Sequence, residues 1–273
     1  CCKFIRLNSY KTKINEREKI MIDIHSHLVY GVDDGSKTIE DTIYMLKEAK
    51  KVGFTDIICT PHYMESYYEV PCNEIFNRIL NVQKLTEEIN IKIHQGNEIY
   101  ANENIIEYIK SKQAMSLNNS RYVLIEFPMQ NKPMNIDQVI YLLLQEGKTP
   151  IVAHPERYSY VRETPNMLLE YIEQGVLFQT NYGSIIGVYG NEIKETAKKL
   201  LTHNMIHFLG SDNHRVNTIY KHIPEALKLL EKWIGQEKTL ELTTNNPKYI
   251  LNDEKLEIDE PIELKKTLWG SWK

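Results

Sequence analysis

Short hydrophobic runs rich in β-branched residues alternate with longer stretches of helical periodicity along most of the chain. The short runs predict strands over residues 22–26, 56–60, 92–97, 121–126, 150–153, 176–180 and 206–210. The longer stretches predict helices over residues 38–52, 73–90, 102–111, 135–147, 165–174 and 190–204, followed by helical segments 221–234 and 236–243. Strands that alternate with helices usually pair in parallel, so the pattern indicates an α/β fold.

Most of the predicted strands end in a residue that can bind a metal ion. The clearest case is Asp-Ile-His-Ser-His over residues 23–27, because alternation along a strand puts His25 and His27 on the same face. The other candidates at strand ends are His62, Glu98, Glu126, His154, Asp212 and His214. An open sheet would gather ligands at one crevice, whereas a closed (β/α) barrel brings nearly every strand end to one rim. We therefore expect a seven-stranded barrel with a metal centre at that rim.

The residue types narrow the choice of metal. Imidazole and carboxylate together suit Zn, Mn or Fe, and a carboxylate can bridge two cations through its two oxygens. A single histidine in a strand is more often packed or hydrogen-bonded than a metal ligand. Residues that can bind a metal occur here at six strand ends, however, which favours a shared metal cluster. The remaining histidines lack this context and are expected to be structural; they are His94, His203, His207 and His222.

Length and composition fit one domain and exclude several functions. The 273 residues, 42% of them hydrophobic, are enough for one large core. A net charge of -4 without a basic block argues against nucleic-acid binding, and no apolar stretch approaches the roughly 20 residues that span a bilayer. The four cysteines show neither metal-site spacing nor a secreted disulfide framework, which favours a cytoplasmic protein.

The two ends of the chain differ from the predicted barrel, which covers residues 21–251. Residues 1–20 carry six Lys or Arg against two Glu and lack an apolar period, and Met21 directly precedes the first strand. We expect a dispensable, disordered or non-native extension; a basic arm that contacts an acidic partner is the alternative. Residues 252–273 are expected to form a C-terminal tail.

Taken together, the motifs resemble the polymerase and histidinol phosphatase (PHP) superfamily, and within it most closely the manganese-dependent protein-tyrosine phosphatases of bacterial capsule and exopolysaccharide synthesis. The resemblance covers residues 21–251 and rests on His-x-His, an Asp-rich turn at 32–35, Thr-Pro-His, Gly-x-Glu, Ile-Glu-Phe, Ala-His-Pro-Glu-Arg and Ser-Asp-x-His. Each motif is weak alone, but the set is specific. It implies a distorted seven-stranded (β/α) barrel of PHP type.

The resemblance also implies a site with three divalent metal ions, with manganese expected and iron, zinc or cobalt possible. One ion would be held by His25, His27, Glu98 and Asp212. Glu98 would bridge to a second ion, which Glu126 and His154 would also bind. The third would be held by His62, His214 and an acid of the turn, for which Asp34 is preferred over Asp33. Spacing alone does not decide between the two aspartates.

Arg157 matches the phosphate-binding arginine of the family, since a guanidinium offers paired donors to phosphate oxygens. An ion pair with Glu156 or another acid is the alternative role. With Arg157 and Asp34 as catalytic residues, the expected reaction is metal-assisted hydrolysis of a phosphomonoester. A cysteine phosphatase would need a phosphate-binding loop after its nucleophile, and neither Cys59 nor Cys72 has one.

The resemblance implies that the substrate is the tyrosine-rich tail of a bacterial autokinase. Tyr63, Tyr67 and Tyr68, in the loop after His62, could stack against an aromatic leaving group, although ordinary packing explains them equally well. Two alternatives stay open: a small-molecule phosphatase such as histidinol phosphatase, and a PHP domain that has lost catalysis and serves as a binding module.

Overall fold

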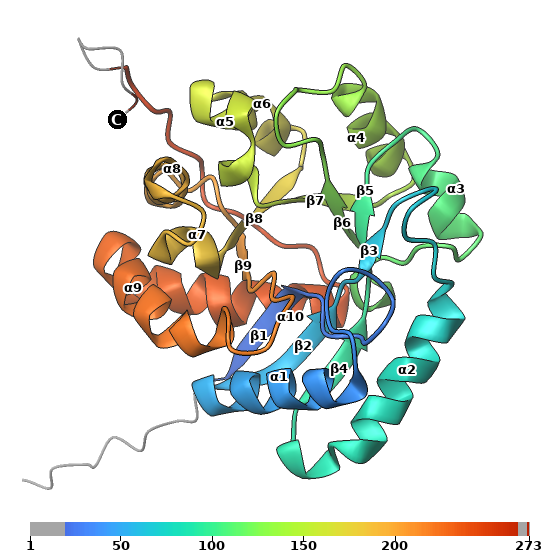
Figure 1. Cartoon of the computed structure of the whole chain (residues 1–273). Helices are drawn as coiled ribbons and strands as arrows, with labels where there is room; N and C mark the ends of the chain where they lie inside the picture. The colour runs from blue at the N-terminus through green and yellow to red at the C-terminus, as the bar shows by residue number, and fades with distance from the viewer. Residues whose placement is uncertain (1–19, 267–271, 273) are drawn as a thin grey trace, which may run out of the picture.

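A parallel β-structure surrounded by helices forms the molecule, as the computed structural model of residues 20–266 and 272 shows (Figure 1). Every pairing between its named strands is parallel. The strands are β1 (Met21–Ser26), β2 (Phe54–Cys59), β3 (His62–Tyr63), β4 (Lys92–Gln95), β5 (Glu98–Tyr100), β6 (Tyr122–Glu126), β7 (Thr149–Ala153), β8 (Leu177–Asn181) and β9 (Phe208–Gly210). They form a three-stranded sheet in the order β1-β2-β4 and a six-stranded sheet in the order β3-β5-β6-β7-β8-β9.

The expected count of seven strands is not confirmed, because two short strands that were not predicted, β3 and β5, follow β2 and β4 and belong to the other sheet. The strand predicted at 56–60 ends in β2, and β3 follows after Thr60 and Pro61; a proline has no N–H with which to continue the ladder. The strand predicted at 92–97 ends at Gln95 in β4, and β5 begins only after Gly96 and Asn97; a Cβ at Gly96 would lie 2.8 Å from Leu117 Cδ2. The α/β class, the parallel pairing and the single domain agree with the prediction.

The two sheets meet along β1 and the end of β9. The Asp212 N–H donates to the carbonyl of His25 at 2.8 Å, and the His27 N–H donates to the carbonyl of Asn213 at 3.2 Å. The buried Asp23 carboxylate strengthens this junction, since it accepts from the Ser211 N–H and from the Tyr220 hydroxyl, both at 2.9 Å. The junction therefore brings the histidines of β1 beside the segment that follows β9.

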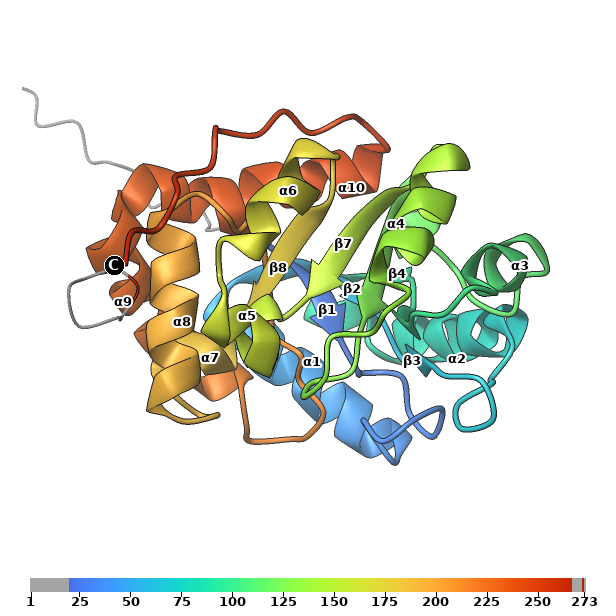
Figure 2. The same ribbon diagram turned by 90° about the horizontal axis from the view of Figure 1, so that it is seen from above.

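Helices enclose the strands on the outside (Figures 1 and 2). The α-helices are α1 (Ile39–Val52), α2 (Cys72–Leu85), α3 (Ile105–Lys110), α4 (Ile136–Gln145), α5 (Ser159–Glu163), α6 (Met167–Glu173), α7 (Tyr182–Ile186), α8 (Asn191–Thr202), α9 (Ile223–Leu240) and α10 (Asn246–Asn252). Shorter turns are η1 (Glu87–Ile89), η2 (Leu117–Asn119), η3 (Pro155–Arg157), η4 (Tyr220–His222) and the π-helical η5 (Glu241–Asn245). No helix in the described part of the chain is long and apolar enough to cross a membrane.

The predicted helices are present, with shifted ends. Thr38 caps α1 in a reciprocal pair with Asp41, and Gly53 ends it with φ of 108°. The segments predicted at 221–234 and 236–243 join in α9, which is kinked at Gly235 where φ is 82°. The short helices α5 and α7 and the helix α10 were not predicted.

Strand alternation divides the core in two. In β6, Tyr122 and Leu124 belong to a cluster shared with other strands, whereas Val123 and Ile125 pack in the larger cluster that includes the helices. Ile250 of α10 and Leu256 of the tail join the first cluster. The Tyr122 hydroxyl also donates to the Glu254 carbonyl at 2.6 Å, so α10 and the tail lie at the amino ends of the strands. The carboxyl ends are left for the polar site.

Candidate metal centre

Nine predicted ligands converge at the carboxyl ends of the strands. His25, Glu98 and Glu126 lie within β1, β5 and β6, His62 begins β3, and His27 and His154 directly follow β1 and β7. Asp34 comes from the loop after β1, and Asp212 and His214 come from the loop after β9. In β6 the side chain of Glu126 continues the inward series of Tyr122 and Leu124, which explains why a carboxylate at this position enters the site. We divide the cluster into an inner pocket (His25, His27, Glu98 and Asp212), a middle pocket (Glu98, Glu126 and His154) and an outer pocket (Asp34, His62 and His214).

The inner pocket is almost completely buried. The Nε2 atoms of His25 and His27 lie 3.2 Å apart, and they lie 3.2 and 3.3 Å from Oε2 of Glu98. Both are 3.5 Å from Oδ1 of Asp212. None of the four residues exposes more than 5% of its surface. Both imidazoles face the same oxygen of Glu98, as the alternation along the strand predicted for His25 and His27.

The middle pocket shares Glu98 with the inner one. Nε2 of His154 lies 3.0 Å from Oε1 of Glu98 and 3.7 Å from Oε1 of Glu126. From the other side, Nδ1 of His62 lies 3.0 Å from Oε2 of Glu98 and 3.9 Å from Oε2 of Glu126. The two oxygens of Glu98 therefore face different groups, as a bridging carboxylate requires.

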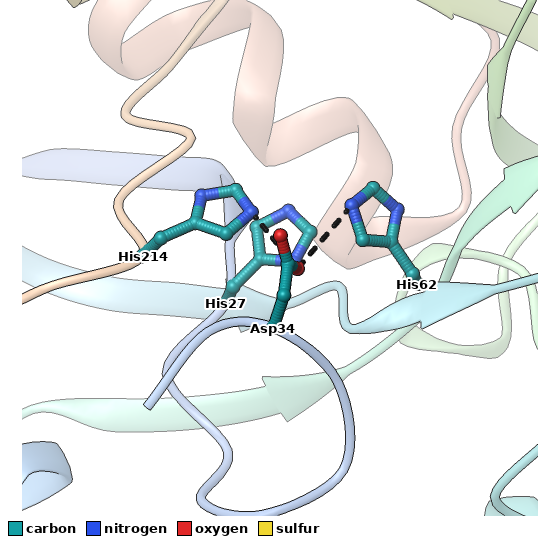
Figure 3. A group of neighbouring side chains, drawn as sticks. All are labelled: His27, Asp34, His62 and His214. Carbon is teal, nitrogen blue, oxygen red and sulfur yellow. Dashed lines mark ion pairs between the residues drawn. The ribbon is translucent and has the colours of Figure 1, made fainter. Parts of the chain in front are cut away.

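The outer pocket is open to solvent; Asp34 and His214 come from loops, and His62 begins β3 (Figure 3). Oδ1 of Asp34 lies 3.4 Å from Nε2 of His214 and 3.7 Å from Nε2 of His62. The side chain of Asp34 is 48% exposed, compared with 18% for His62 and 24% for His214. His27 stacks on His214 with ring centroids 3.8 Å apart, which joins the outer pocket to the inner one.

The structure gives the two neighbouring aspartates different surroundings. Asp33 is buried, and its Oδ2 accepts from Nδ1 of His27 at 2.7 Å and from the N–H of His62 at 3.0 Å. Its Oδ1 accepts from the Gly35 N–H at 2.8 Å. Oδ1 of Asp34, by contrast, has no hydrogen-bond partner among the described residues. Asp33 is thus used to orient two histidines, and Asp34 is available as a ligand.

Arg157 lies at the edge of the inner pocket, in η3 after β7. Its Nη1 donates to Oδ2 of Asp212 at 3.1 Å, and its guanidinium stacks on the ring of Tyr189 at 4.7 Å from the centroid. The acid that pairs with Arg157 is thus Asp212 rather than Glu156, whose fully buried carboxylate accepts from Thr180, Asn181 and Ser184. Arg157 makes no other side-chain hydrogen bond to the described residues, so its remaining donors can serve a phosphate.

Two candidate ligands have unusual backbone conformations. His154 has φ of 35° and Asp212 has φ of 50°, in the left-handed region that non-glycine residues rarely adopt. Such conformations cost on the order of 1–3 kcal/mol each and tend to be kept at functional sites, where the surrounding structure enforces them. These turns direct the His154 side chain toward Glu98 and the Asp212 side chain toward His25 and His27.

The dense packing of charge shifts several pKa values. Burial by itself lowers the pKa of His25, but the carboxylates of Glu98 and Asp212 raise it to about 9. His62 behaves likewise, with Glu98 as the main opposing charge, and reaches about 10. Burial and the charge of Glu98 raise the pKa of Glu126 to about 8. The pKa of Asp212 is about 2, because His25 and His214 outweigh its burial. In the metal-free protein, protons on His25 and His62 therefore balance the charge of the carboxylates, which bound cations would otherwise balance.

One atom tests whether these residues fit metal ions. Oε2 of Glu98 is buried and makes no hydrogen bond, yet nitrogens of His25, His27 and His62 lie within 3.3 Å of it. A buried carboxylate oxygen without a donor is costly unless a cation satisfies it. Together with a donor set of imidazole and carboxylate groups, this arrangement fits divalent metal ions.

The remaining histidines lie outside this cluster, as expected. His94 pairs with Asp56 at 3.0 Å, and the ring of His203 bonds the Lys199 carbonyl at 2.8 Å. His207 accepts from the Phe178 N–H at 3.0 Å, and burial lowers its pKa to about 3. His222 is at the surface near Glu225. Cys59 is buried in β2, and burial raises the pKa of its thiol, which fits a core role.

Two polar residues of β8 contact the proposed ligands but were not predicted from the sequence. Oε1 of Gln179 lies 2.8 Å from Nδ1 of His25, and Nδ2 of Asn181 donates to Oδ2 of Asp212 at 2.7 Å. An amide in a strand has no distinctive sequence signal. The only available hint was that Gln179 and Asn181 lie at intervals of two from Leu177, on the same face of the predicted strand.

Comparison with known proteins identifies the family. The family model for capsular polysaccharide synthesis, CpsB/CapC, matches residues 21–252. The tyrosine-protein phosphatase YwqE of Bacillus subtilis (strain 168) is 36% identical over 228 residues, which cover 82% of this chain and 89% of YwqE. The tyrosine-protein phosphatase CpsB of Streptococcus pneumoniae is 32% identical, with 86% of this chain and 99% of that protein covered.

A solved structure agrees with the sequence comparison. It belongs to crystallographic work on YwqE from Bacillus subtilis and CpsB from Streptococcus pneumoniae, described as unique metal-dependent tyrosine phosphatases. It superposes with a TM-score of 0.84 and 34% identity, covering 90% of this chain and all of the other. The resemblance to the capsule phosphatases is confirmed: the chain belongs to the CpsB/CapC family of capsular polysaccharide synthesis.

Proposed function

We propose that the protein is a metal-dependent protein-tyrosine phosphatase of bacterial capsule or exopolysaccharide synthesis. The single observation that carries the proposal is Oε2 of Glu98, a buried oxygen without a hydrogen bond that three imidazoles face, with Arg157 beside the same pocket. The relatives that are named tyrosine-protein phosphatases support the same activity. A site that combines divalent cations with a guanidinium suits a phosphomonoester dianion.

Three divalent ions, with manganese preferred, fit the three pockets. The inner ion would be held by His25, His27, Glu98 and Asp212, and the middle ion by Glu98, Glu126 and His154. The outer ion would be held by His62 through Nε2, by His214 and by Asp34, because the geometry leaves Asp33 engaged with His27. When bound, such ions lower the pKa of water and offset the negative charge of the phosphate.

The chain's own groups have separate tasks in this reaction. Arg157 would donate to the non-bridging phosphate oxygens from a position held by Asp212 and Tyr189. Asp33 fixes the ring of His27 and the backbone of His62, and Asp34 would complete the open end of the site. A phenolate leaves more readily than an alkoxide, so phosphotyrosine needs less assistance from an acid than phosphoserine.

The substrate would be a phosphotyrosine-bearing protein, and we infer the tyrosine-rich tail of an autokinase. Of the three loop tyrosines, Tyr63 is buried and donates to Gln113, so its role is packing. Tyr68 stacks on His62 with centroids 5.7 Å apart, and Tyr67 is 74% exposed. These two can contact an aromatic side chain entering from the outer pocket.

We further infer that the strands act as one distorted ring of seven. Counting β2 with β3 and β4 with β5 gives seven chain segments, and the hydrogen bonds between β1 and the end of β9 support closure. Residues 21–251 would form this barrel, with residues 252–273 as its tail. The prediction that residues 1–20 form a dispensable extension concerns residues that, apart from Ile20, lie outside the described part of the chain. The two described cysteines are free, which is compatible with a cytoplasmic enzyme.

The assignment is tested with protein stripped of metal and then supplied with Mn²⁺. We expect hydrolysis of a phosphotyrosyl peptide with kcat/KM well above that for the matched phosphoseryl peptide and for histidinol phosphate. A preference for histidinol phosphate would support the small-molecule phosphatase instead. Absence of both bound metal and turnover would support a non-catalytic binding module.

A further inference from the structure

No proposed ligand lies in β8 or directly follows it. Its inward residues are nevertheless polar: Gln179 and Asn181 follow Leu177 of the interior cluster at intervals of two. Both amides are completely buried, as is Thr180 between them. Burying an amide is costly unless its hydrogen bonds are satisfied, so both side chains need hydrogen-bond partners in the interior of the protein.

The two amides link opposite sides of the inner pocket in a continuous chain. Oε1 of Gln179 lies 2.8 Å from Nδ1 of His25. Nε2 of Gln179 donates to Oδ1 of Asn181 at 2.8 Å, and Nδ2 of Asn181 donates to Oδ2 of Asp212 at 2.7 Å. The same oxygen of Asp212 accepts from Arg157 at 3.1 Å. The chain thus runs from one proposed ligand to another and ends at the phosphate-binding arginine.

The direction of every hydrogen bond in this chain is fixed by Asp212. An ionised carboxylate can only accept, so Asn181 must present its NH₂ group to Asp212 and its oxygen to Gln179. Gln179 must then present its NH₂ group to Asn181 and its oxygen to His25. An oxygen facing Nδ1 of His25 requires that this nitrogen carry the proton, which leaves the Nε2 lone pair for a metal.

Close packing holds the chain in place. Gly210 of β9 lies against both His25 and Gln179: a Cβ there would come within 2.6 Å of the His25 Cβ and 2.8 Å of the Gln179 Nε2. Only glycine allows β9 to approach this closely. The main chain of Asn181 also donates to Glu156 at 3.0 Å, which connects β8 to the turn that carries His154 and Arg157.

We propose that Gln179 and Asn181 are positioning residues that set the tautomer of His25 and the orientation of Asp212 for metal binding. The inference rests on the proposed function, because it concerns the same metal centre. Asn181 leaves Oδ1 of Asp212 directed at His25 and His27, while Oδ2 is used for the hydrogen bonds to Asn181 and Arg157. The inner pocket is therefore oriented before a cation arrives.

The test measures zinc affinity by competition with a chelator in Gln179→Met, Gln179→Glu and Asn181→Leu. Methionine has a similar length but no strong acceptor, whereas glutamate keeps an acceptor toward His25. Gln95→Leu is the matched control, since Gln95 is also a buried strand glutamine but bonds the carbonyl of Cys72 instead. We expect affinity to fall about 10- to 100-fold in the Met and Leu variants, as for other groups that support metal ligands, and less in Gln179→Glu. The control should bind zinc like the wild type.

A second measurement does not depend on whether the variants fold. Long-range ¹H–¹⁵N spectra of the zinc-loaded wild type, labelled at histidine, should show His25 protonated at Nδ1 and bound through Nε2. Coordination through Nδ1, or equal affinity in Gln179→Met and the wild type, would overturn the inference. Equal losses in Gln179→Met and Gln179→Glu would also overturn it. A wild type that binds zinc but does not hydrolyse phosphotyrosine would refute the proposed function alone, and one that binds no metal would refute both.

Discussion

The inner and outer pockets use the same kinds of ligand but differ in what surrounds them. In the inner pocket, Gln179 contacts His25, Asp33 contacts His27, and Asn181 contacts Asp212, all in buried surroundings. In the outer pocket, Asp34 is 48% exposed, and its Oδ1 has no hydrogen bond to the described residues. Buried and oriented ligands bind a cation with little reorganisation, whereas exposed loop ligands must be ordered by the cation itself. The comparison predicts a tightly bound inner ion and an exchangeable outer ion that adapts to the substrate.

The largest effect is expected for Glu98→Gln, because Glu98 belongs to both the inner and the middle pocket. The amide keeps the size of the side chain but loses the charge that faces four histidines, three at Oε2 and His154 at Oε1. We expect a loss of at least one bound metal ion, measured by elemental analysis. We also expect kcat to fall by roughly 10³-fold or more, which is a larger loss than the removal of one charge-stabilising donor causes. Glu65→Gln, at an exposed position, is the control. Full metal content with normal turnover would show that Glu98 is not a bridging ligand.

Arg157→Ala should separate phosphate binding from metal binding. It removes the guanidinium but none of the proposed ligands, so metal content should be unchanged. We expect kcat/KM on a phosphotyrosyl peptide to fall by about 10²-fold or more, as for the removal of one charge-stabilising donor. Activity within a factor of two of the wild type would leave Arg157 only its ion pair with Asp212.

The neighbouring aspartates offer a sharper test of the two pockets. Asp34→Asn should weaken only the outer ion, so activity should recover when Mn²⁺ is added in excess. Asp33→Asn keeps only one of the two acceptor oxygens that hold His27, the His62 N–H and the Gly35 N–H, so its inner ion should bind about 10- to 100-fold more weakly. Metal titrations of both variants measure the difference. The reverse pattern would assign Asp33 as the ligand and Asp34 as the supporting residue.

A smaller effect is expected from pH. In the metal-free protein the pKa values of His25 and His62 are about 9 and about 10, so both carry protons near neutrality that a cation must displace. Metal affinity should therefore rise as pH increases from 6 to 9. These raised pKa values also stabilise the metal-free fold below the unfolded histidine value of about 6.5, and that contribution is lost as pH rises through the folded values. Unfolding of the metal-free protein that is independent of pH in this range would contradict the arrangement of charges.

Much of the site was predictable because strand ends leave a clear signal in the sequence. Each of His62, Glu98, Glu126 and His154 follows or ends a hydrophobic run, and parallel strands bring such positions together. The breaks after β2 and β4 were not predicted, since a proline or a glycine in a run does not show whether the chain continues in the next sheet. The helix α10 was missed because its burial depends on contacts with the amino ends of distant strands.

The supporting residues were harder to predict than the ligands. Gln179 and Asn181 lie 154 and 31 positions from the residues that they contact, His25 and Asp212. Nothing in the local sequence links an amide to a histidine so far away. The choice of Asp34 over Asp33 likewise depends on the path of the turn, which passes so close to His27 that a Cβ at Gly35 would lie 2.3 Å from the carbonyl of His27.

The central claim is that the inner ion is tightly bound and the outer ion is exchangeable. Its most direct test is anomalous diffraction at the manganese edge from crystals grown with Mn²⁺, before and after a brief wash with a weak chelator. We predict peaks in the inner, middle and outer pockets before the wash, and loss of the outer peak first. A strongest peak beside Asp34, or no peak beside Glu98, would contradict the account.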